Sequence, residues 1–156
     1  MNYKDRILIK LDEMNQYLEE LDKILPDEFI DYQTNLTVRR ACEKTIELAI
    51  ETVIDVISII IAGKKLGIPN DEDSLISLVE KNKIISSSLA KKLMEMKGFR
   101  NILVHKYGDI DDQRVYEYLK EEIVDFNTFN KEINLFLKKS WWLLFKSSQN
   151  INFNIW

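Results

Sequence analysis

The sequence contains few of the residues that make tight turns, with four glycines and two prolines among 156 residues. Average proteins contain about 12% of these two residues together. A β-sandwich or barrel needs many tight turns, so this scarcity favours helices joined by few connections. No segment shows a convincing alternation of polar and apolar residues with period two, and the sequence therefore predicts an all-α fold.

Cysteine and histidine occur once each, as Cys42 and His105. A lone cysteine forms no intrachain disulfide and no thiolate metal cluster, and it is typical of a reducing compartment. A lone histidine excludes a His-rich metal cluster within one chain. We therefore expect no metal site and no cofactor, and we expect Cys42 to be an inert helix residue.

Long apolar stretches are missing as well. The apolar run at residues 53–63 is interrupted by Asp55 and Ser58, and it is shorter than the roughly 20 residues that span a bilayer. The first ten residues contain no apolar region that leads to a cleavage site. The sequence predicts no association with a membrane and a cytoplasmic location.

The overall composition is typical of a globular protein, with 46% hydrophobic and 31% charged residues and a net charge of −4. This is enough for one domain with a sizeable core. The acidic total argues against a general DNA-binding coat, but it says little about local patches. Residues 91–106 contain five basic side chains against Glu95 alone, and they include His105.

Two long helices are expected in the first half of the chain. Apolar residues at positions 7–25 recur at alternating spacings of four and three, which predicts a helix that ends at Pro26. A longer helix is expected from about residue 33 to residue 62, stopping at Gly63. It is apolar on most of its circumference, so we expect it to be central in a bundle.

The polar residues of this second helix are regularly spaced. Its acidic stripe consists of Glu43, Glu47, Glu51 and Asp55, one at every fourth position. Residues four apart are neighbours on one side of a helix. The stripe is therefore either the most solvent-exposed side of a central helix or a source of carboxylates for a functional site.

Three further helices complete the expected bundle. A short helix opens with the acids at positions 71–73, where the helix dipole favours negative charge. Ser86 is the expected N-cap of the next helix, and Gly98 either ends that helix or lies inside it. The last long helix opens near Asp111 or Asp112. Its expected inward-facing residues are Val115, Leu119, Ile123, Phe126, Ile133 and Leu137. The result is a mostly antiparallel bundle of four or five helices.

The last stretch of the chain differs in composition from the rest. Residues 138–156 hold all three tryptophans, together with several asparagines. We predict a division into a helical bundle at residues 1–137 and a Trp-rich extension at residues 138–156. The extension is either a helix that packs on a partner or a poorly ordered tail.

The most informative segment covers residues 98–111. It resembles the Arg-x4-His-x-Tyr signature of HEPN-domain ribonucleases, in particular the HepT-like toxins. The matching residues are Arg100, His105 and Tyr107, with Asn101 after the arginine as in many relatives. The likeness extends to the order and lengths of the helices over roughly residues 1–137.

The resemblance implies a HEPN-like bundle that acts as a homodimer, with a composite site where two protomers meet. It implies RNA as the substrate, for instance tRNA, and an MntA-like nucleotidyltransferase antitoxin as the partner. In the resembling toxins, the antitoxin attaches AMP groups to the motif tyrosine, which is Tyr107 here. Such bulky negative groups block a site that binds RNA phosphate.

The chemistry of the residues agrees with this resemblance. RNA is cut without metal when its own 2′-OH attacks the adjacent phosphate. That step needs a base, an acid for the leaving 5′-oxygen, and positive charge on the phosphorane. Histidine exchanges protons near neutral pH, which suits His105 to the first two tasks. Arginine keeps its charge and offers forked donors to phosphate oxygens, which suits Arg100 to the third.

The spacing of the two residues leaves their arrangement open. On an uninterrupted helix, Arg100 and His105 lie about 140° apart around the axis. Either both border a cleft between subunits, or the helix loosens near Gly98 or Gly108. A two-fold interface lets each subunit contribute one His105, which supplies both acid and base.

Arg100 also has a purely structural interpretation. A buried arginine needs an acidic partner, and a carboxylate of the acidic stripe is a candidate. The same carboxylates could orient Arg100 for phosphate, so Glu51 and Asp55 are candidate supporting residues, as is Asn101. Tyr107 is also open to interpretation as a packing aromatic.

The sequence thus predicts a metal-independent endoribonuclease, the toxin of a toxin–antitoxin pair. The alternative is a non-catalytic helical subunit that binds a nucleotide, or provides dimerisation, for a separately encoded nucleotidyltransferase. A third interpretation is a dimerisation module whose apolar extension mediates association.

Overall fold

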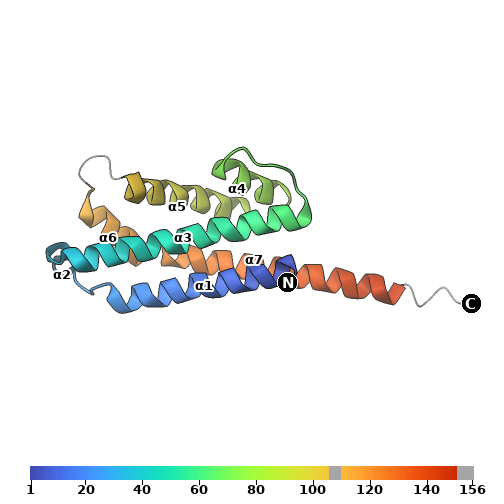
Figure 1. The fold of residues 1–156 in the computed structure, drawn as a ribbon, viewed down its shortest axis with the longest axis horizontal. Coiled ribbons are helices and arrows are strands. Elements are labelled where there is room, and N and C mark those ends of the chain that lie inside the picture. Colours follow the sequence, from blue (N-terminus) through green and yellow to red (C-terminus); the bar gives the residue numbers. More distant parts are fainter. Residues whose placement is uncertain (106–109, 151–156) are drawn as a thin grey trace, which may run out of the picture.

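The computed structural model describes residues 1–105 and 110–150 (Figure 1). Over these residues it contains seven helices and no strand, which confirms the all-α prediction. The helices are α1 (Tyr3–Ile24), α2 (Phe29–Thr34), α3 (Leu36–Lys64), α4 (Glu72–Lys81), α5 (Ser87–His105), α6 (Asp112–Glu121) and α7 (Ile123–Asn150). The five predicted helices correspond to α1, α3, α4, α5 and the pair α6–α7, and α2 is an additional short helix.

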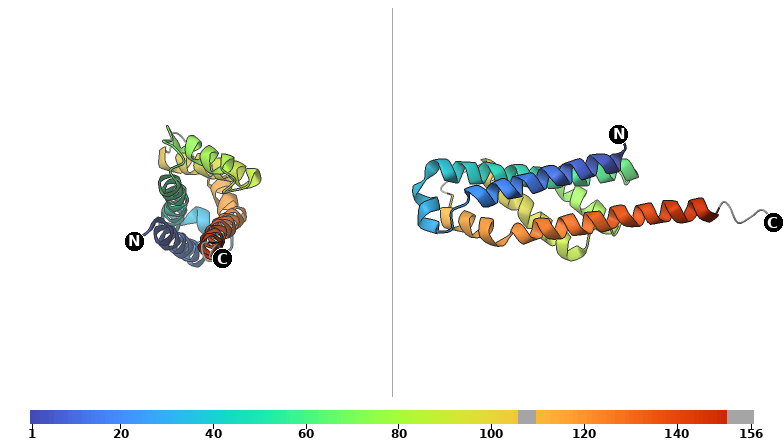
Figure 2. Two further views of the ribbon diagram at one scale, coloured as in Figure 1. Left: turned by 90° about the vertical axis from the view of Figure 1, so that its right-hand side faces the viewer. Right: turned by 90° about the horizontal axis from the view of Figure 1, so that it is seen from below.

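The long helices form a mostly antiparallel bundle. Helix α1 packs along α3, and the end-on view shows α1, α3, α7 and the α4–α5 pair around a common interior (Figure 2). Helix α5 runs toward the end of the bundle that holds α2 and α6, whereas α7 runs away from it (Figure 1). None of the helices in the described ranges is long and apolar enough to cross a membrane.

Helix α3 supplies much of the core, as its apolar composition predicts. Its fully buried side chains include Cys42, Ile46, Ile50, Val53, Ile57 and Ile60. Full burial of one such aliphatic side chain contributes about 1.5–3 kcal/mol. Burial also raises the pKa of the Cys42 thiol to about 11, so the thiol stays protonated and unreactive.

The ends of α3 differ from the prediction by a few residues. The helix begins at Leu36, after the separate helix α2, and the Asn35 side chain caps it by accepting the N–H of Val38 at 3.1 Å. It ends at Lys64, followed by a left-handed residue at position 65. Gly63 therefore lies inside the helix and does not end it.

Gly63 has a packing role instead. A Cβ atom at this position would overlap the aromatic ring of Tyr3, at the start of α1. The missing side chain lets the N-terminal turn of α1 approach the last turn of α3. This contact is tertiary, which is why the sequence pattern indicated a helix end.

The last long helix of the prediction is divided in two. Asp111 caps α6 as expected, but the helix stops at Glu121 and α7 begins at Ile123. No glycine or proline marks this break. Of the six residues predicted to face inward, Ile123 is partly buried and the other five are buried.

Helix α7 continues without a break past residue 137 to residue 150. Its last turns project beyond the rest of the bundle (Figure 2). Residues 141–145 are all apolar, and each is 59–70% exposed. The extension was expected to be either a helix or a poorly ordered tail, and its part up to residue 150 is a helix. Trp156 lies outside the described residues, and the division at residue 137 stays a prediction.

Candidate functional site

Arg100 lies in the second half of α5, with its side chain only 13% exposed. The guanidinium forms an ion pair with Glu72, the first residue of α4. The same nitrogen, Nη2, also donates to Oδ1 of Asn101 at 3.1 Å. The acidic partner of Arg100 is therefore Glu72, and the predicted partners on the acidic stripe are not the ones that the structure shows.

A second ion pair runs parallel to the first. Lys97, one turn before Arg100 on α5, pairs with Asp73, the neighbour of Glu72. Asp71 caps α4 by accepting the backbone N–H and the hydroxyl of Ser74, each at 2.7 Å. These two hydrogen bonds lower the pKa of Asp71. The acidic first turn of α4 thus lies against a basic side of α5.

His105 is the last residue of α5, and its side chain is exposed. The helix is continuous from Ser87 to His105 and includes Gly98, so it does not loosen at Gly98. Arg100 and His105 therefore keep their separation of about 140° around the helix axis. Within one chain, Arg100 faces α4 and His105 faces outward at the helix end.

Of the two remaining motif residues, the structure describes Asn101 but not Tyr107. The half-buried Asn101 contacts Arg100 through its side-chain oxygen. Tyr107, together with Gly108, lies outside the described residues.

The acidic stripe does not act as one surface. A step of four residues turns the helix by about 40° beyond a full turn, so the stripe winds around α3. Glu43 is buried and accepts from Arg40 at 3.0 Å, whereas Asp55 is exposed and pairs with Lys10 at 3.1 Å. Glu51 is half-buried. Among the contacts of the described residues, none joins Glu51 or Asp55 to Arg100.

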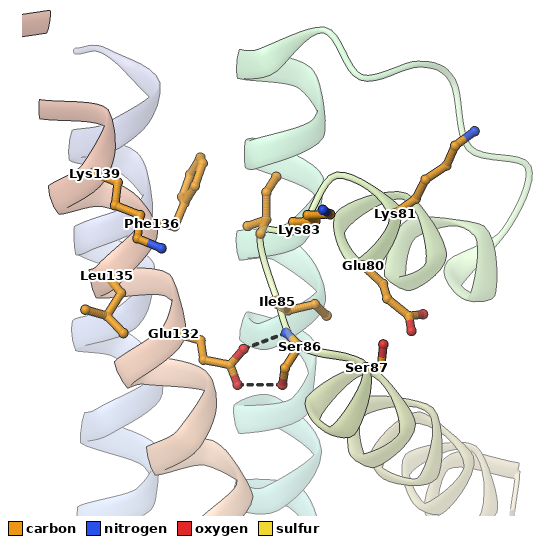
Figure 3. Close-up of a pocket in the computed structure, with 11 residues that line it drawn as sticks. Glu80, Lys81, Lys83, Ile85, Ser86, Ser87, Glu132, Leu135, Phe136 and Lys139 are labelled. Atoms are coloured by element: carbon orange, nitrogen blue, oxygen red, sulfur yellow. Dashed lines mark hydrogen bonds between the residues drawn. The ribbon is translucent and has the colours of Figure 1, made fainter. Parts of the chain in front are cut away.

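A separate cavity of about 500 Å³ lies between α7 on one side and the end of α4 with the connection from α4 to α5 on the other (Figure 3). At its wall, Glu132 accepts the backbone N–H of Ser86 at 2.6 Å and the hydroxyl at 3.0 Å. The Ser86 hydroxyl also accepts the N–H of Leu89, which confirms Ser86 as the cap of α5. Ser86 and Arg100 are about 21 Å apart along the helix, so this cavity is distinct from the motif.

Sequence reasoning missed Glu72. The helix dipole explains why acids occur at positions 71–73, but it does not indicate which side chains they contact. No local pattern connects position 72 with position 100, because the contact depends on how α4 folds back over α5 (Figure 1).

The described residues thus form an all-α bundle in which helix α5 carries both Arg100 and His105. A family model described as ribonuclease HepT-like matches residues 14–133. The chain belongs to the ribonuclease HepT-like family, and this assigns it to the ribonucleases.

Individual relatives agree with this family. The tRNA nuclease HepT of Aphanizomenon flos-aquae is 26% identical over 82% of this chain and 87% of its own length. The mRNA nuclease HepT of Shewanella oneidensis is 24% identical over 80% of this chain and 93% of its own length. A solved structure of the tri-AMPylated Shewanella oneidensis HEPN toxin, in complex with its MNT antitoxin, is similar in fold. It has a TM-score of 0.79 and 24% identity over 86% of this chain and 99% of that one.

Proposed function

We propose that the protein is a metal-independent endoribonuclease, the toxin of a toxin–antitoxin pair, acting in the cytoplasm. The observation that carries the proposal is the end of α5. Arg100 is held there by an acidic partner, and His105, the only histidine, is exposed five residues later. Metal-free cleavage of RNA needs a proton-transferring group and a positive charge on the phosphate, and these two side chains can supply them.

The reaction begins with the 2′-oxygen of a ribose attacking the adjacent phosphorus. A base removes the 2′-proton, the bond from phosphorus to the 5′-oxygen breaks, and an acid protonates the leaving oxygen. His105 takes the role of base or acid. Arg100 binds the scissile phosphate and stabilises the charge that builds on its oxygens in the transition state.

One chain contains one histidine, whereas the reaction has two proton transfers. A homodimer with two-fold symmetry brings a second His105 to the same cleft. The outward direction of His105 suits a cleft that a second protomer completes. Asn101 supports Arg100 directly, and Glu51 and Asp55 act only through the wider electrostatic field.

The comparisons support RNA as the substrate, since one relative is a tRNA nuclease and another an mRNA nuclease. We propose tRNA as the first substrate to test. The AMPylated toxin bound to its MNT antitoxin supports a nucleotidyltransferase partner. The modified residue is then Tyr107, where added phosphates repel RNA from the site.

The test is cleavage of total tRNA in EDTA by wild type, His105→Ala and Arg100→Ala, with Arg114→Ala as a matched control. Arg114 lies on α6 with its side chain 86% exposed. Wild type and Arg114→Ala should cut, and each motif variant should lose at least about 100-fold in rate, as expected for removal of an acid–base group or an oxyanion-stabilising donor. Intact mass identifies any adenylylated sample, which is expected to be inactive.

Equal activity of wild type and His105→Ala would remove the nuclease proposal. The absence of cleavage by unmodified wild type, together with a tight complex with a nucleotidyltransferase, would support the non-catalytic subunit instead. The observation that favours this second candidate is the ion pair of Arg100, because a structural arginine also has such a partner.

A further inference from the structure

The contact between Arg100 and Glu72 joins the motif to a helix that the motif does not include. The Arg100 side chain is largely screened from solvent, with an exposed fraction of 13%, and Glu72 is partly buried, with an exposed fraction of 34%. A charge-assisted hydrogen bond in such surroundings is stronger than one on an open surface. It limits the rotamers of a long side chain that otherwise keeps several.

The contacts of the guanidinium fix its plane. Nη2 donates both to Glu72 and to Asn101. Two acceptors on one terminal nitrogen of a planar group set the direction of its remaining N–H bonds. Those bonds are the ones that a phosphate must meet.

Glu72 is itself held in place. It is the first residue of α4, between the capping residue Asp71 and Asp73, which pairs with Lys97. Helix α4 lies over α5 (Figure 1). The carboxylate of Glu72 therefore belongs to a packed helix terminus with contacts of its own.

We propose that Glu72 is a positioning residue, which orients Arg100 for the scissile phosphate. This inference rests on the proposed nuclease function. The carboxylate orients Arg100 even though its own negative charge repels RNA. In the competing account, Glu72 blocks Arg100 until RNA displaces the carboxylate. Under that account, removing Glu72 would strengthen RNA binding and speed cleavage, which is the opposite of what we expect.

The test compares Glu72→Ala with Asp73→Ala. Both variants remove one acid from the first turn of α4 and one ion pair with α5, but only Glu72→Ala frees Arg100. Misplacing a group that acts in the transition state costs up to about 100-fold in rate, and we expect Glu72→Ala to lower kcat at least about tenfold. Asp73→Ala should stay within about twofold, and Glu72→Gln, which keeps an oxygen acceptor, should recover part of the loss.

Binding supplies a second readout, measured with tRNA in a His105→Ala background that does not cut. If Glu72 orients Arg100, Glu72→Ala weakens binding although it removes a negative charge. Asp73→Ala, with the same change of charge, leaves binding unchanged or tightens it. Tighter binding or faster cleavage by Glu72→Ala would establish the blocking account, and equal losses in both variants would reduce the contact to packing of α4.

The third readout does not depend on nuclease activity. Nitrogen-15 spectra of the arginine guanidinium groups should show hindered rotation of Arg100 in wild type and in Asp73→Ala. Glu72→Ala should release this rotation. An unchanged Arg100 signal in Glu72→Ala would overturn the inference. If wild type cuts no RNA, the proposed function fails, and these spectra still decide whether Glu72 holds Arg100.

Discussion

Arg100 and Asp125 show how the surroundings change a single charged residue. Arg100 of α5 forms an ion pair with a carboxylate that α4 supplies. Asp125, in the first turn of α7, is less well paired. Partial burial, the hydrogen bond with Glu122 and the negative charges of Glu122 and Glu95 together raise its pKa to about 6, and the positive charge of Lys92 lowers it.

The sign of this shift predicts how stability depends on pH. The folded pKa of Asp125 lies above the value of about 3.9 for an unfolded aspartate, so the folded state binds the proton more tightly. Its contribution is fully present below about pH 4 and is lost as pH rises through about 6. Asp125→Asn should therefore raise Tm at pH 7 to 8, by an amount that falls toward zero near pH 4.

Thermal melts of wild type and Asp125→Asn between pH 4 and pH 8 measure this effect. Asp22→Asn, at an exposed aspartate of α1, serves as the control and should show no such trend. A difference in Tm that is constant across the range would contradict the assignment.

At the scale of elements, Tyr32 of α2 and Tyr116 of α6 pack against each other at one end of the bundle. The rings of Tyr32 and Tyr116 lie 5.3 Å apart between their centroids. The Tyr116 hydroxyl lies within hydrogen-bonding distance of the carbonyl oxygens of Pro26 and Asp27, at 2.9 and 2.7 Å, and its single proton is shared between these two acceptors. The buried hydroxyl of Tyr32 has no partner among the described residues.

The matched substitutions should therefore differ. Tyr116→Phe should lower the free energy of unfolding by about 0.5–1.5 kcal/mol, because it removes the hydroxyl that bonds the partly buried carbonyl oxygens between α1 and α2. Tyr32→Phe removes an unsatisfied hydroxyl and should leave the stability unchanged or higher. Urea unfolding of the two variants and wild type measures these free energies. Equal destabilisation by the two substitutions would contradict the hydrogen-bond assignment.

At the scale of the whole molecule, the proposed dimer makes a quantitative prediction. If each site uses a His105 from both chains, a dimer with one His105→Ala chain is inactive. After exchange of subunits in equal amounts, activity should fall to about a quarter of that of wild type alone, because only one dimer in four has two intact chains.

The measurement mixes wild type with His105→Ala, allows exchange, and records cleavage of tRNA. Mixing with Arg114→Ala should leave the activity close to that of wild type, which controls for the exchange step. Activity of half the wild-type value, the result for independent chains, would refute the composite site. Light scattering establishes the mass of the assembly.

Much of the secondary structure could be predicted because it depends on local patterns. The seam at residues 7–25, the cap at Ser86 and the acids that open α4 and α6 each act within a turn or two of helix. The break at Glu122 could not be predicted, because the sequence has no glycine or proline there to mark a helix end.

The candidate site divides in the same way. The residue types Arg100 and His105, and their spacing of five, are properties of the chain itself, and their chemistry follows from them. Which carboxylate meets Arg100 was decided by the packing of α4 on α5, since residues 72 and 100 are far apart in sequence. The four-residue spacing of the acidic stripe indicated one surface, but the helix turns by 100° per residue, so Glu43 is buried and Asp55 is exposed. Local sequence therefore determined the helices and the reactive groups, whereas tertiary packing decided the ion-pair partners of Arg100 and Lys97, because those contacts join segments that no short-range pattern connects.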